Sequence, residues 1–406
     1  MKKIPTKLDV KLLLVAILTF LLGWQLGHRD VQLRWENFRP TVSVVSRDVP
    51  QNVNIDFKLF WDTWDLLSKH YIDKTALDTK KLFYGAISGM VAAVGDPYTV
   101  FLPPDQQKSS QEELSGSFEG VGIQLGFNKE KRLVVIAPLE GTPAKEAGIK
   151  PQDMIVKIDD KDTTGMSLPE AVKLIRGPKG SKVNLTIFRE GDSDTKSYTL
   201  TRDTIIVKSV EVSFTNTKNN KNVAVIKLSR FGEKTNDEWI QAISQITDKN
   251  PSGVILDVRN NPGGFLESAV FIGSEFLEGG DVVLQENNQG QRAPYKVNRS
   301  GKLTKLPLQV LINKGSASAS EIVAGALQDR RRATLIGEKS FGKGTIQEAQ
   351  DLAEGTGIHI TVAKWLTPNG RWVNDTQGLE PDVKMEMDKN DETKDPQLEK
   401  ALELLE

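Results

Sequence analysis

The sequence predicts an α+β multidomain protein with a helical N-terminal unit, a β-rich middle and a mixed α/β core. Aromatic residues recur at helical spacing over residues 56–71. Short β-type runs follow one another between residues 111 and 203. From Thr204 onward, strand-like and helix-like segments alternate, which favours a mixed sheet covered by helices.

Composition removes several classes of catalytic site. The 406 residues contain no cysteine, which excludes cysteine nucleophiles, thiolate zinc sites and disulfides. Three histidines, His28, His70 and His359, and no H-E-x-x-H motif leave a Ser-His-Asp triad poorly supplied. The net charge is −1, without the basic excess typical of nucleic-acid binding. We therefore expect no metal, no cofactor and no nucleic-acid partner.

Residues 1–28 are interpreted as a targeting segment. Four lysines among the first 11 residues precede an almost wholly apolar run over residues 12–26, the pattern of a secretory signal. The run is short for a membrane span, and no clear A-x-A cleavage site follows it. An uncleaved signal anchor and a cleaved signal peptide both fit, and we favour the anchor. The protein would then be held in the cell membrane by a single pass with the rest of the chain extracytoplasmic, or secreted if the signal is cleaved.

The next two regions differ in periodicity. Residues 29–55 have mixed polarity and little periodicity, and we interpret them as a linker. Residues 56–104 form the helical N-terminal region, with a second helix predicted over 80–94 and ended by Gly95-Asp96-Pro97. The many aromatic residues indicate packing, within the chain or against a second subunit.

Residues 111–203 resemble a PDZ domain. G-V-G-I at Gly120, Val121, Gly122 and Ile123 matches the carboxylate-binding loop, residues 138–159 the middle of the domain, and residues 171–180 the groove helix and its end. In such a loop successive backbone N–H groups hold a terminal carboxylate, while an extended peptide adds to a sheet edge. The resemblance implies a protein C-terminus as ligand.

Arg176 ends the predicted groove helix. By the same resemblance it would sense a bound substrate and relay its presence to the core, and a plain surface arginine is the alternative.

The core, residues 204–385, contains the segments with candidate catalytic residues. A buried strand is broken by R-N-N-P-G-G (259–264), another leads into N-K-G-S-A-S-A-S-E (313–321), and F-G-K-G (341–344) follows. A serine hydroxyl needs a base, and a lysine can serve only if its pKa falls from about 10.4 to roughly 7–8. The spacing S-x-x-E is also that of an ordinary helix capping box, and it does not choose among the three serines.

The order of these segments, with the PDZ-like region before them, resembles the carboxyl-terminal processing (tail-specific) serine proteases over about residues 56–405. The resemblance implies a crotonase-like core in which Ser318 is the nucleophile, Lys343 the general base and Gln347 the residue that orients the lysine. Ser318 can cap a helix and still be the nucleophile.

The oxyanion is expected to bind backbone N–H groups. The candidates are Gly263 and Gly264 of the P-G-G turn and Ala319 after the nucleophile. The sequence does not decide which glycine faces the oxyanion.

We therefore expect a membrane-anchored extracytoplasmic serine endopeptidase that recognises protein C-termini through its PDZ domain and cleaves near them. Residues 386–406 are an acidic tail with an amphipathic helix after Pro396, suited to docking on the core or to a subunit contact. The family resemblance favours a homodimer. The alternative is a PDZ adaptor with an inactive core, which would require the loss of Ser318, Lys343 or Gln347; all three are present.

Overall fold

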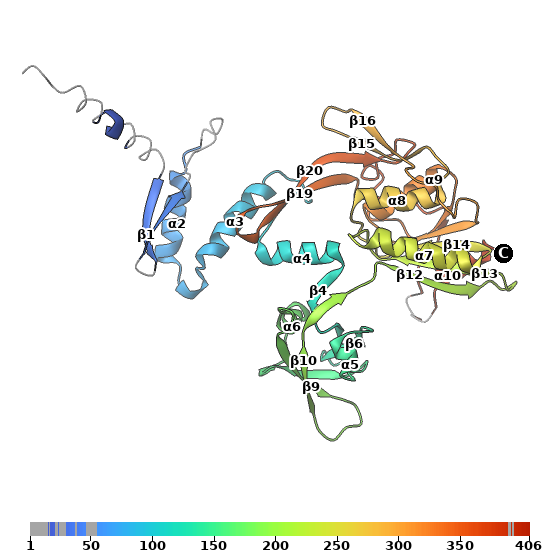
Figure 1. The fold of residues 1–406 in the computed structure, drawn as a ribbon, viewed down its shortest axis with the longest axis horizontal. Coiled ribbons are helices and arrows are strands. Elements are labelled where there is room, and N and C mark those ends of the chain that lie inside the picture. Colours follow the sequence, from blue (N-terminus) through green and yellow to red (C-terminus); the bar gives the residue numbers. More distant parts are fainter. Residues whose placement is uncertain are drawn as a thin grey trace, which may run out of the picture. The chain divides into compact units, whose positions relative to one another are not determined.

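The computed structural model describes residues 15, 17–20, 23, 30–36, 39–45, 55–388, 391 and 394–406. The chain divides into two compact units, residues 1–82 and 83–406 (Figure 1). Most of the predicted targeting segment lies outside the described residues. Among the residues that are described, no helix is both long and apolar enough to cross a membrane.

The first unit contains a β-hairpin where a linker was expected. Strands β1 (Asp30–Glu36) and β2 (Arg39–Val45) pair antiparallel, so the linker interpretation of residues 29–55 was wrong for this stretch. Apolar residues alternate with polar ones in D-V-Q-L-R-W-E, which is strand periodicity, but the nearby prolines concealed it. Helix α2 (Lys58–His70) follows as predicted and buries none of its residues.

Helices α3 and α4 precede the PDZ-like region. Helix α3 spans Thr79–Ala92, as the sequence predicts within two residues. A short strand, β3 (Val100–Leu102), and helix α4 (Pro104–Ser115) come next. The sequence analysis left α4 unassigned, although Pro104 at its first turn and Gly116 at φ 67° after it are ordinary start and stop signals.

The PDZ-like region folds as the resemblance implied. A sheet in the order β10-β9-β7-β6-β5 packs on two helices, and β8 (Lys161–Asp162) pairs with β7. The strands are β5 (Ile123–Phe127), β6 (Leu133–Pro138), β7 (Met154–Ile158), β9 (Lys182–Phe188) and β10 (Lys196–Thr201), and the helices are α5 (Pro143–Glu146) and α6 (Leu168–Ile175). Strands β4 (Ser117–Gly120) and β11 (Asp203–Ile206) pair antiparallel where the chain enters and leaves the domain.

The core is built on a sheet in the order β12-β13-β14-β17-β18-β21, parallel except for β12. Helices cover both faces. The strands are β12 (Val210–Asn216), β13 (Asn222–Leu228), β14 (Gly253–Asp257), β17 (Leu308–Ile312), β18 (Thr334–Gly337) and β21 (Val383–Lys384), and the helices are α7 (Thr235–Lys249), α8 (Leu266–Phe276), α9 (Ala319–Asp329) and α10 (Pro396–Glu403).

Alternate residues of each central strand enter two different cores. Leu256 and its neighbours pack with α7, α8 and α9, whereas Ile255 packs with Ala401 and Leu405 of the C-terminal segment. Burial on both faces explains the continuous apolar runs of β14 and β17. The amphipathic tail helix therefore docks on the core of its own chain.

A second sheet adjoins the loop that contains Lys343. Its order is β16-β15-β20-β19, and β3 pairs with the outer part of β20. The strands are β15 (Asp281–Glu286), β16 (Arg292–Lys296), β19 (Thr345–Asp351) and β20 (Gly357–Leu366). The expected α+β architecture is confirmed, and the two sheets place the serine and lysine segments on separate supports.

Candidate active site

Ser318 lies where the central sheet meets helix α9. Strand β17 ends at Ile312, five residues of loop follow, and Ser318 is the N-cap of the helix. Its φ of 54° and ψ of −116° are rare for a residue other than glycine. Such strain persists only where the surroundings enforce it, and it concentrates at functional sites.

The three serines of this segment differ in their partners. Ser316 Oγ donates to Val258 O at 2.8 Å, and Ser320 Oγ donates to Ala317 O at 2.7 Å. Both residues are fully buried, so their hydroxyls serve the local backbone. Ser318 is half-buried and is the member of the run that solvent and a substrate can reach.

One buried carboxylate joins the serine segment to the lysine segment. Glu321 is inaccessible to solvent and accepts four hydrogen bonds. Its donors are Ser318 N–H at 2.8 Å, Ser340 Oγ at 2.5 Å, Gly342 N–H at 2.7 Å and Lys343 N–H at 2.9 Å. The predicted capping box of Ser318 and Glu321 is therefore present, and its glutamate also holds the backbone of the lysine loop.

Glu321 is held in a strongly desolvating site. Burial raises the pKa of its carboxyl above the ordinary value, and the four donated hydrogen bonds oppose that rise.

Two tryptophan indoles hold the main chain of the F-G-K-G loop by hydrogen bonds. Trp365 Nε1 donates to Lys343 O at 2.9 Å, and Trp372 Nε1 donates to Gly344 O at 2.8 Å. A β-carbon on Gly344 would lie 2.5 Å from the Trp372 nitrogen, so the close packing requires glycine there. The main chain at the lysine is thus held at Lys343 N–H, Lys343 O and Gly344 O.

The Lys343 side chain is half-buried, as a lysine base requires. Its Nζ lies 4.9 Å from the centre of the Tyr98 ring. Burial lowers the pKa of the Lys343 ammonium, while the negative charges of Asp96 and Glu321 oppose the shift. The desolvation favours the neutral amine, which is the form that can accept a proton.

The predicted dyad is not closed by a direct contact. Within residues 55–388 the structure records no hydrogen bond between the Ser318 hydroxyl and Lys343 Nζ. Catalytic hydrogen bonds are often long without substrate.

Gln347 lies on β19 opposite Thr361, and its Nε2 donates to Thr345 Oγ1 at 2.8 Å and to Thr361 Oγ1 at 3.0 Å.

The P-G-G turn approaches Ser318 closely. A β-carbon on Gly263 would lie 2.8 Å from Ser318 Cβ and 2.9 Å from Ala319 N. Gly263 N–H already donates to Asn261 Oδ1 at 2.9 Å. In residues 55–388 no acceptor is recorded for the N–H of Gly264 or of Ala319, the first residue of α9. Of the three predicted oxyanion donors, these two are unoccupied.

The G-V-G-I loop lies at the open edge of the PDZ sheet. Val121 is buried, and its carbonyl accepts Ala144 N–H at 3.0 Å. Gly122 has φ 76°, and a β-carbon there would lie 2.4 Å from Thr142. Ile123 then begins β5, the edge strand next to α6. The structure therefore brings together the loop, edge and helix that a terminal peptide would need.

Arg176 is part of a chain of polar contacts. Its Nη1 donates to Glu112 Oε2 on α4 at 2.6 Å, and its guanidinium lies 4.4 Å from the centre of the Phe118 ring. On the same helix Gln107 Nε2 donates to Asp351 Oδ1 at 2.6 Å, at the far end of β19. Helix α4 thus connects the end of the PDZ helix to the strand that carries Gln347.

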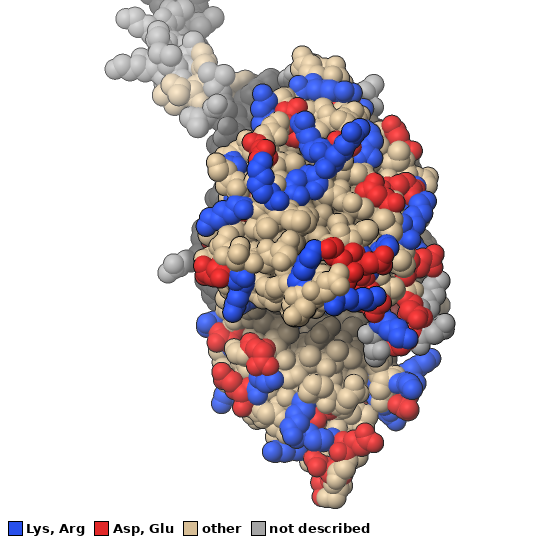
Figure 2. Space-filling model, turned by 90° about the vertical axis from the view of Figure 1, so that its right-hand side faces the viewer, with Lys and Arg blue, Asp and Glu red and all other residues tan. Residues whose placement is uncertain are grey.

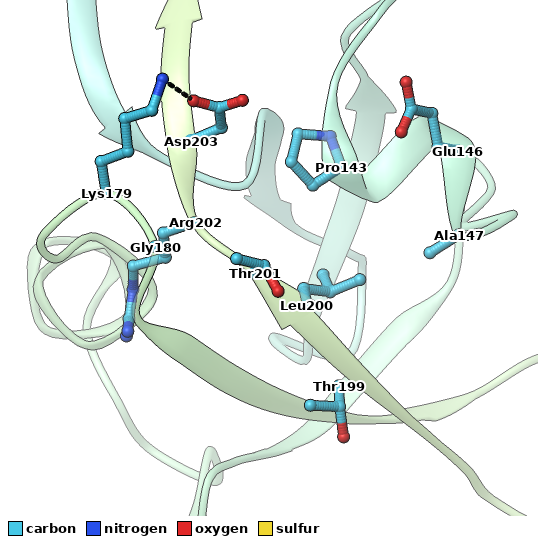
Figure 3. A pocket seen from close by; sticks show the side chains of 10 residues that line it. All are labelled: Pro143, Glu146, Ala147, Lys179, Gly180, Thr199, Leu200, Thr201, Arg202 and Asp203. Atoms are coloured by element: carbon cyan, nitrogen blue, oxygen red, sulfur yellow. Dashed lines mark ion pairs between the residues drawn. The ribbon is translucent and has the colours of Figure 1, made fainter.

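Two surface features lie outside this site. A pocket of about 420 Å³ opens between α5 and β10, and the Lys179–Asp203 ion pair of 2.6 Å lies at its border (Figure 3). It contains none of the predicted peptide-binding residues. On the face shown in Figure 2, acidic and basic side chains are interspersed without a field of one sign.

Sequence reasoning missed the supports of the lysine. Glu321 was seen only as a helix cap, and Tyr98, which follows the Gly95-Asp96-Pro97 helix end, was given no role. No local pattern marks the two indoles under the lysine loop, because β20 and the turn after it reach the loop only through the fold.

Comparison with known proteins identifies the three regions independently. Residues 222–385 match the model of peptidase family S41, residues 134–189 a PDZ domain, and residues 33–106 the N-terminal domain of the activating protease CtpB. Together with the solvent-accessible Ser318, these matches define a serine-type peptidase that carries a PDZ domain.

The relatives narrow the class further. The chain is 40% identical over 325 residues to the carboxy-terminal processing protease CtpA of Bacillus subtilis, covering 80% of this chain and 68% of the relative. It is 39% identical to a carboxyl-terminal-processing protease of Synechocystis, with 81% of each chain covered. The solved photosystem II D1 C-terminal processing protease is 31% identical with a TM-score of 0.50, covering 81% of this chain and 92% of that one. The chain belongs to the family of carboxyl-terminal processing serine proteases.

Proposed function

We propose that the chain cleaves polypeptides near their C-termini by a Ser–Lys mechanism, with Ser318 as nucleophile and Lys343 as general base. The observation that carries this proposal is the Glu321 carboxylate. It holds Ser318 N–H and Lys343 N–H on the same oxygen, at 2.8 and 2.9 Å, and so fixes the two segments against each other. The lowered pKa of the buried lysine supports its role as the base.

In the first step, neutral Lys343 Nζ takes the Ser318 proton as Oγ attacks the substrate carbonyl carbon. The tetrahedral oxyanion is held by the N–H groups of Gly264 and Ala319. The intermediate collapses when the C–N bond breaks and the lysine gives its proton to the leaving amine. Water, activated by the same lysine, then releases the acyl group from Ser318. Gln347 orients the lysine through its amide.

The test compares turnover of a folded protein with an unstructured C-terminal tail. Ser318→Ala and Lys343→Ala should each abolish cleavage while the full chain stays folded. Lys339→Ala, which removes a neighbouring half-buried lysine paired with Glu380, is the matched control and should cleave normally. Normal cleavage by either of the first two variants would remove the assignment.

We further propose that the PDZ domain binds the terminal carboxylate of the substrate at Gly120–Ile123, with the peptide added beside β5. Support comes from the open edge of β5 and from the Gly122 backbone. On the Ser318→Ala protein, a tail peptide with a free carboxylate should bind at least about tenfold more tightly than its amidated form. Equal affinities in isothermal titration would contradict this.

Arg176 would communicate occupancy of this groove through Glu112 and α4 to β19. The hydrogen bonds at both ends of α4 support the route. Arg176→Gln should lower turnover of a tailed substrate more than that of a short peptide too small to fill the groove. An equal loss on both substrates would argue against communication.

We also propose that the chain is anchored in the membrane by its N-terminal segment, with the protease extracytoplasmic, and that it forms homodimers. The basic start and apolar run support the anchor. Helix α2 supports dimerisation, since it exposes Leu59, Trp61 and Leu66. N-terminal sequencing of the exported protein tests the anchor, and analytical ultracentrifugation of a Trp61→Glu variant tests the dimer.

A further inference from the structure

Asn261 lies in the R-N-N-P-G-G turn after β14 and is completely buried. A buried amide needs hydrogen-bond partners, and both ends of this one have them. Its Nδ2 donates to Leu228 O, at the end of β13, at 2.8 Å, and its Oδ1 accepts Gly263 N–H at 2.9 Å. The second bond closes an Asx turn, in which a side chain holds the backbone two residues further on. The amide therefore ties the P-G-G turn to the central sheet.

The backbone of Asn261 also contacts the segment that contains Ser318. Its carbonyl oxygen accepts Ala317 N–H at 2.9 Å, and Ser320 Oγ lies 2.9 Å from the same oxygen. These two contacts lie on either side of Ser318 in the sequence. One residue thus joins the end of β13, the P-G-G turn and the start of α9.

The two glycines of the turn differ in what occupies their backbone groups. Gly263 is buried and its N–H donates to Asn261, whereas Gly264 is exposed. A parallel bridge to Phe231 uses Gly263 O, which accepts Phe231 N–H at 2.8 Å, and Phe265 N–H, which donates to Phe231 O at 2.8 Å. Gly264 N–H takes no part in this bridge, and no acceptor is recorded for it in the part of the core that the structure describes. It is therefore the glycine donor that a substrate can reach.

We propose that Asn261 is the positioning residue of the oxyanion site. By accepting the Gly263 N–H it leaves Gly264 N–H to meet the substrate oxyanion, and through its carbonyl it holds the turn at a fixed distance from Ala319 N–H. Preorganised donors stabilise an oxyanion only when they lie about 3 Å from the place where it forms. The proposal rests on the role of Ser318 given above, and it explains why a polar side chain is buried beneath this turn.

Asn261 also supports the fold, so the experiment has to separate positioning from stability. A peptide boronic acid forms a tetrahedral adduct with a serine hydroxyl and places one oxygen where the oxyanion forms. The same peptide without the boronic acid group binds without that oxygen. A misplaced turn should weaken binding of the boronic acid alone, because transition-state analogues depend on contacts that the ground state does not make. A general loss of folded protein reduces binding of both peptides alike.

The experiment measures kcat and KM on a tailed protein substrate, and the affinities of both peptides, with full-chain variants at a temperature at which circular dichroism shows them folded. Asn261→Ala should lower kcat and boronic acid affinity about 100-fold each, and should change KM and the affinity of the plain peptide by less than about threefold. Asn261→Ser, whose hydroxyl can close the same turn more weakly, should keep kcat and boronic acid affinity within about tenfold of wild type.

Asn298→Ala is the matched control. It removes an exposed asparagine that accepts Ser274 Oγ at 3.2 Å near the other end of α8, and it should leave all four readouts unchanged. Asn261→Ala with kcat and boronic acid affinity close to wild type would overturn the proposal. A loss of about 100-fold in boronic acid affinity by Asn261→Ser would also overturn it, and this comparison decides if the alanine variant does not fold. If Ser318→Ala itself cleaves normally, the Ser–Lys mechanism fails instead, so the two failures are distinguishable.

Discussion

The two halves of the site are supported in different ways. Ser318 follows a fully buried strand and begins a helix whose first nine residues are all buried. Lys343 precedes β19, a strand with no buried residue, and it depends on Trp365, Trp372 and the segment from Asp96 to Thr99. The serine belongs to the central core, whereas the lysine is held by contacts from several distant parts of the chain.

This difference indicates which half can respond to the rest of the molecule. A buried core is close-packed, so its side chains cannot shift without a large cost in free energy. The lysine side is bound by hydrogen bonds at a sheet edge, and α4 and β3 both contact that sheet. Contacts from elsewhere in the chain therefore reach the site on its lysine side, and Glu321 joins that side to the serine side by accepting an N–H group from each.

The largest effect is expected from removing the Glu321 carboxylate, which joins the serine and lysine segments. Glu321→Ala would leave Ser318 N–H, Gly342 N–H, Lys343 N–H and the Ser340 hydroxyl without their acceptor inside the protein. Each of the four unsatisfied groups costs about 1–3 kcal/mol, so we expect the free energy of unfolding to fall by about 4 kcal/mol or more and turnover to be lost. Urea denaturation and a cleavage assay measure both. A variant with near-normal stability would show that the four donors find other partners.

A smaller effect should follow from pushing the P-G-G turn away from the nucleophile. In Gly263→Ala the new β-carbon would meet Ala317 O and Ser318 Cβ, both at 2.8 Å, from a backbone at φ 102°. The turn must shift to relieve these contacts, and a displacement of about 1 Å should reduce kcat about 100-fold.

Gly290→Ala is the matched control for this substitution. Its φ is also positive, at 76°, but a β-carbon there enters open space. It should cost stability and leave kcat nearly unchanged. Equal losses of kcat in the two variants would point to a general backbone effect.

The pH profile of the wild-type enzyme tests whether Lys343 acts as the base. Since burial lowers the pKa of Lys343, the neutral amine becomes available below the ordinary lysine value of 10.5. The protonated form cannot accept the serine proton, so kcat/KM should rise with pH and level off above the pKa of Lys343. A profile that falls with pH over this range would contradict a lysine base. Lys343→Arg should show no such limb, since arginine stays charged.

The smallest effect is expected from the ion pair between Arg259 and Asp395. Arg259, which precedes the P-G-G turn, pairs with Asp395 at the start of α10, with Nη2 to Oδ2 at 2.8 Å. Burial would raise the pKa of Asp395, but the hydrogen bonds from Arg259 hold it below the ordinary value. Asp395→Asn should therefore lower the free energy of unfolding by about 1–2 kcal/mol at pH 7.

The pH dependence gives that substitution an internal check. A carboxylate with a lowered pKa stabilises the fold above its ordinary pKa, and this contribution is lost as pH falls through the lower folded value. The stability difference between Asp395→Asn and wild type should thus shrink in acid. Urea melts at pH 7 and near pH 3 measure it, and a difference that grows in acid would exclude the pair as its source.

The sequence predicted most of the architecture, because the relevant signals are local. The apolar runs of β14 and β17, the helix after Ser318 and the glycines of the PDZ loop can each be recognised within a few residues. The family resemblance then ordered them into an S41 core with a PDZ domain before it, and the matches over residues 134–189 and 222–385 confirm that order.

What the sequence did not predict depends on residues far apart in the chain. The hairpin at residues 30–45 was concealed by two prolines, and α4 has too few apolar residues to show a periodic face. The contacts of Thr99 with Thr361 and of Glu321 with the lysine loop arise only after two sheets have formed. No pattern within one segment could have linked them.

The backbone of Ser318 has a thermodynamic consequence of its own. A φ of 54° with ψ of −116° costs a residue with a β-carbon on the order of 1–3 kcal/mol, which the rest of the fold must supply. Alanine at this position removes the hydroxyl but keeps that cost, whereas glycine removes both. An inactive Ser318→Gly protein should therefore be more stable than both the enzyme and its alanine variant, so that part of the fold's stability is spent on holding one hydroxyl ready to react.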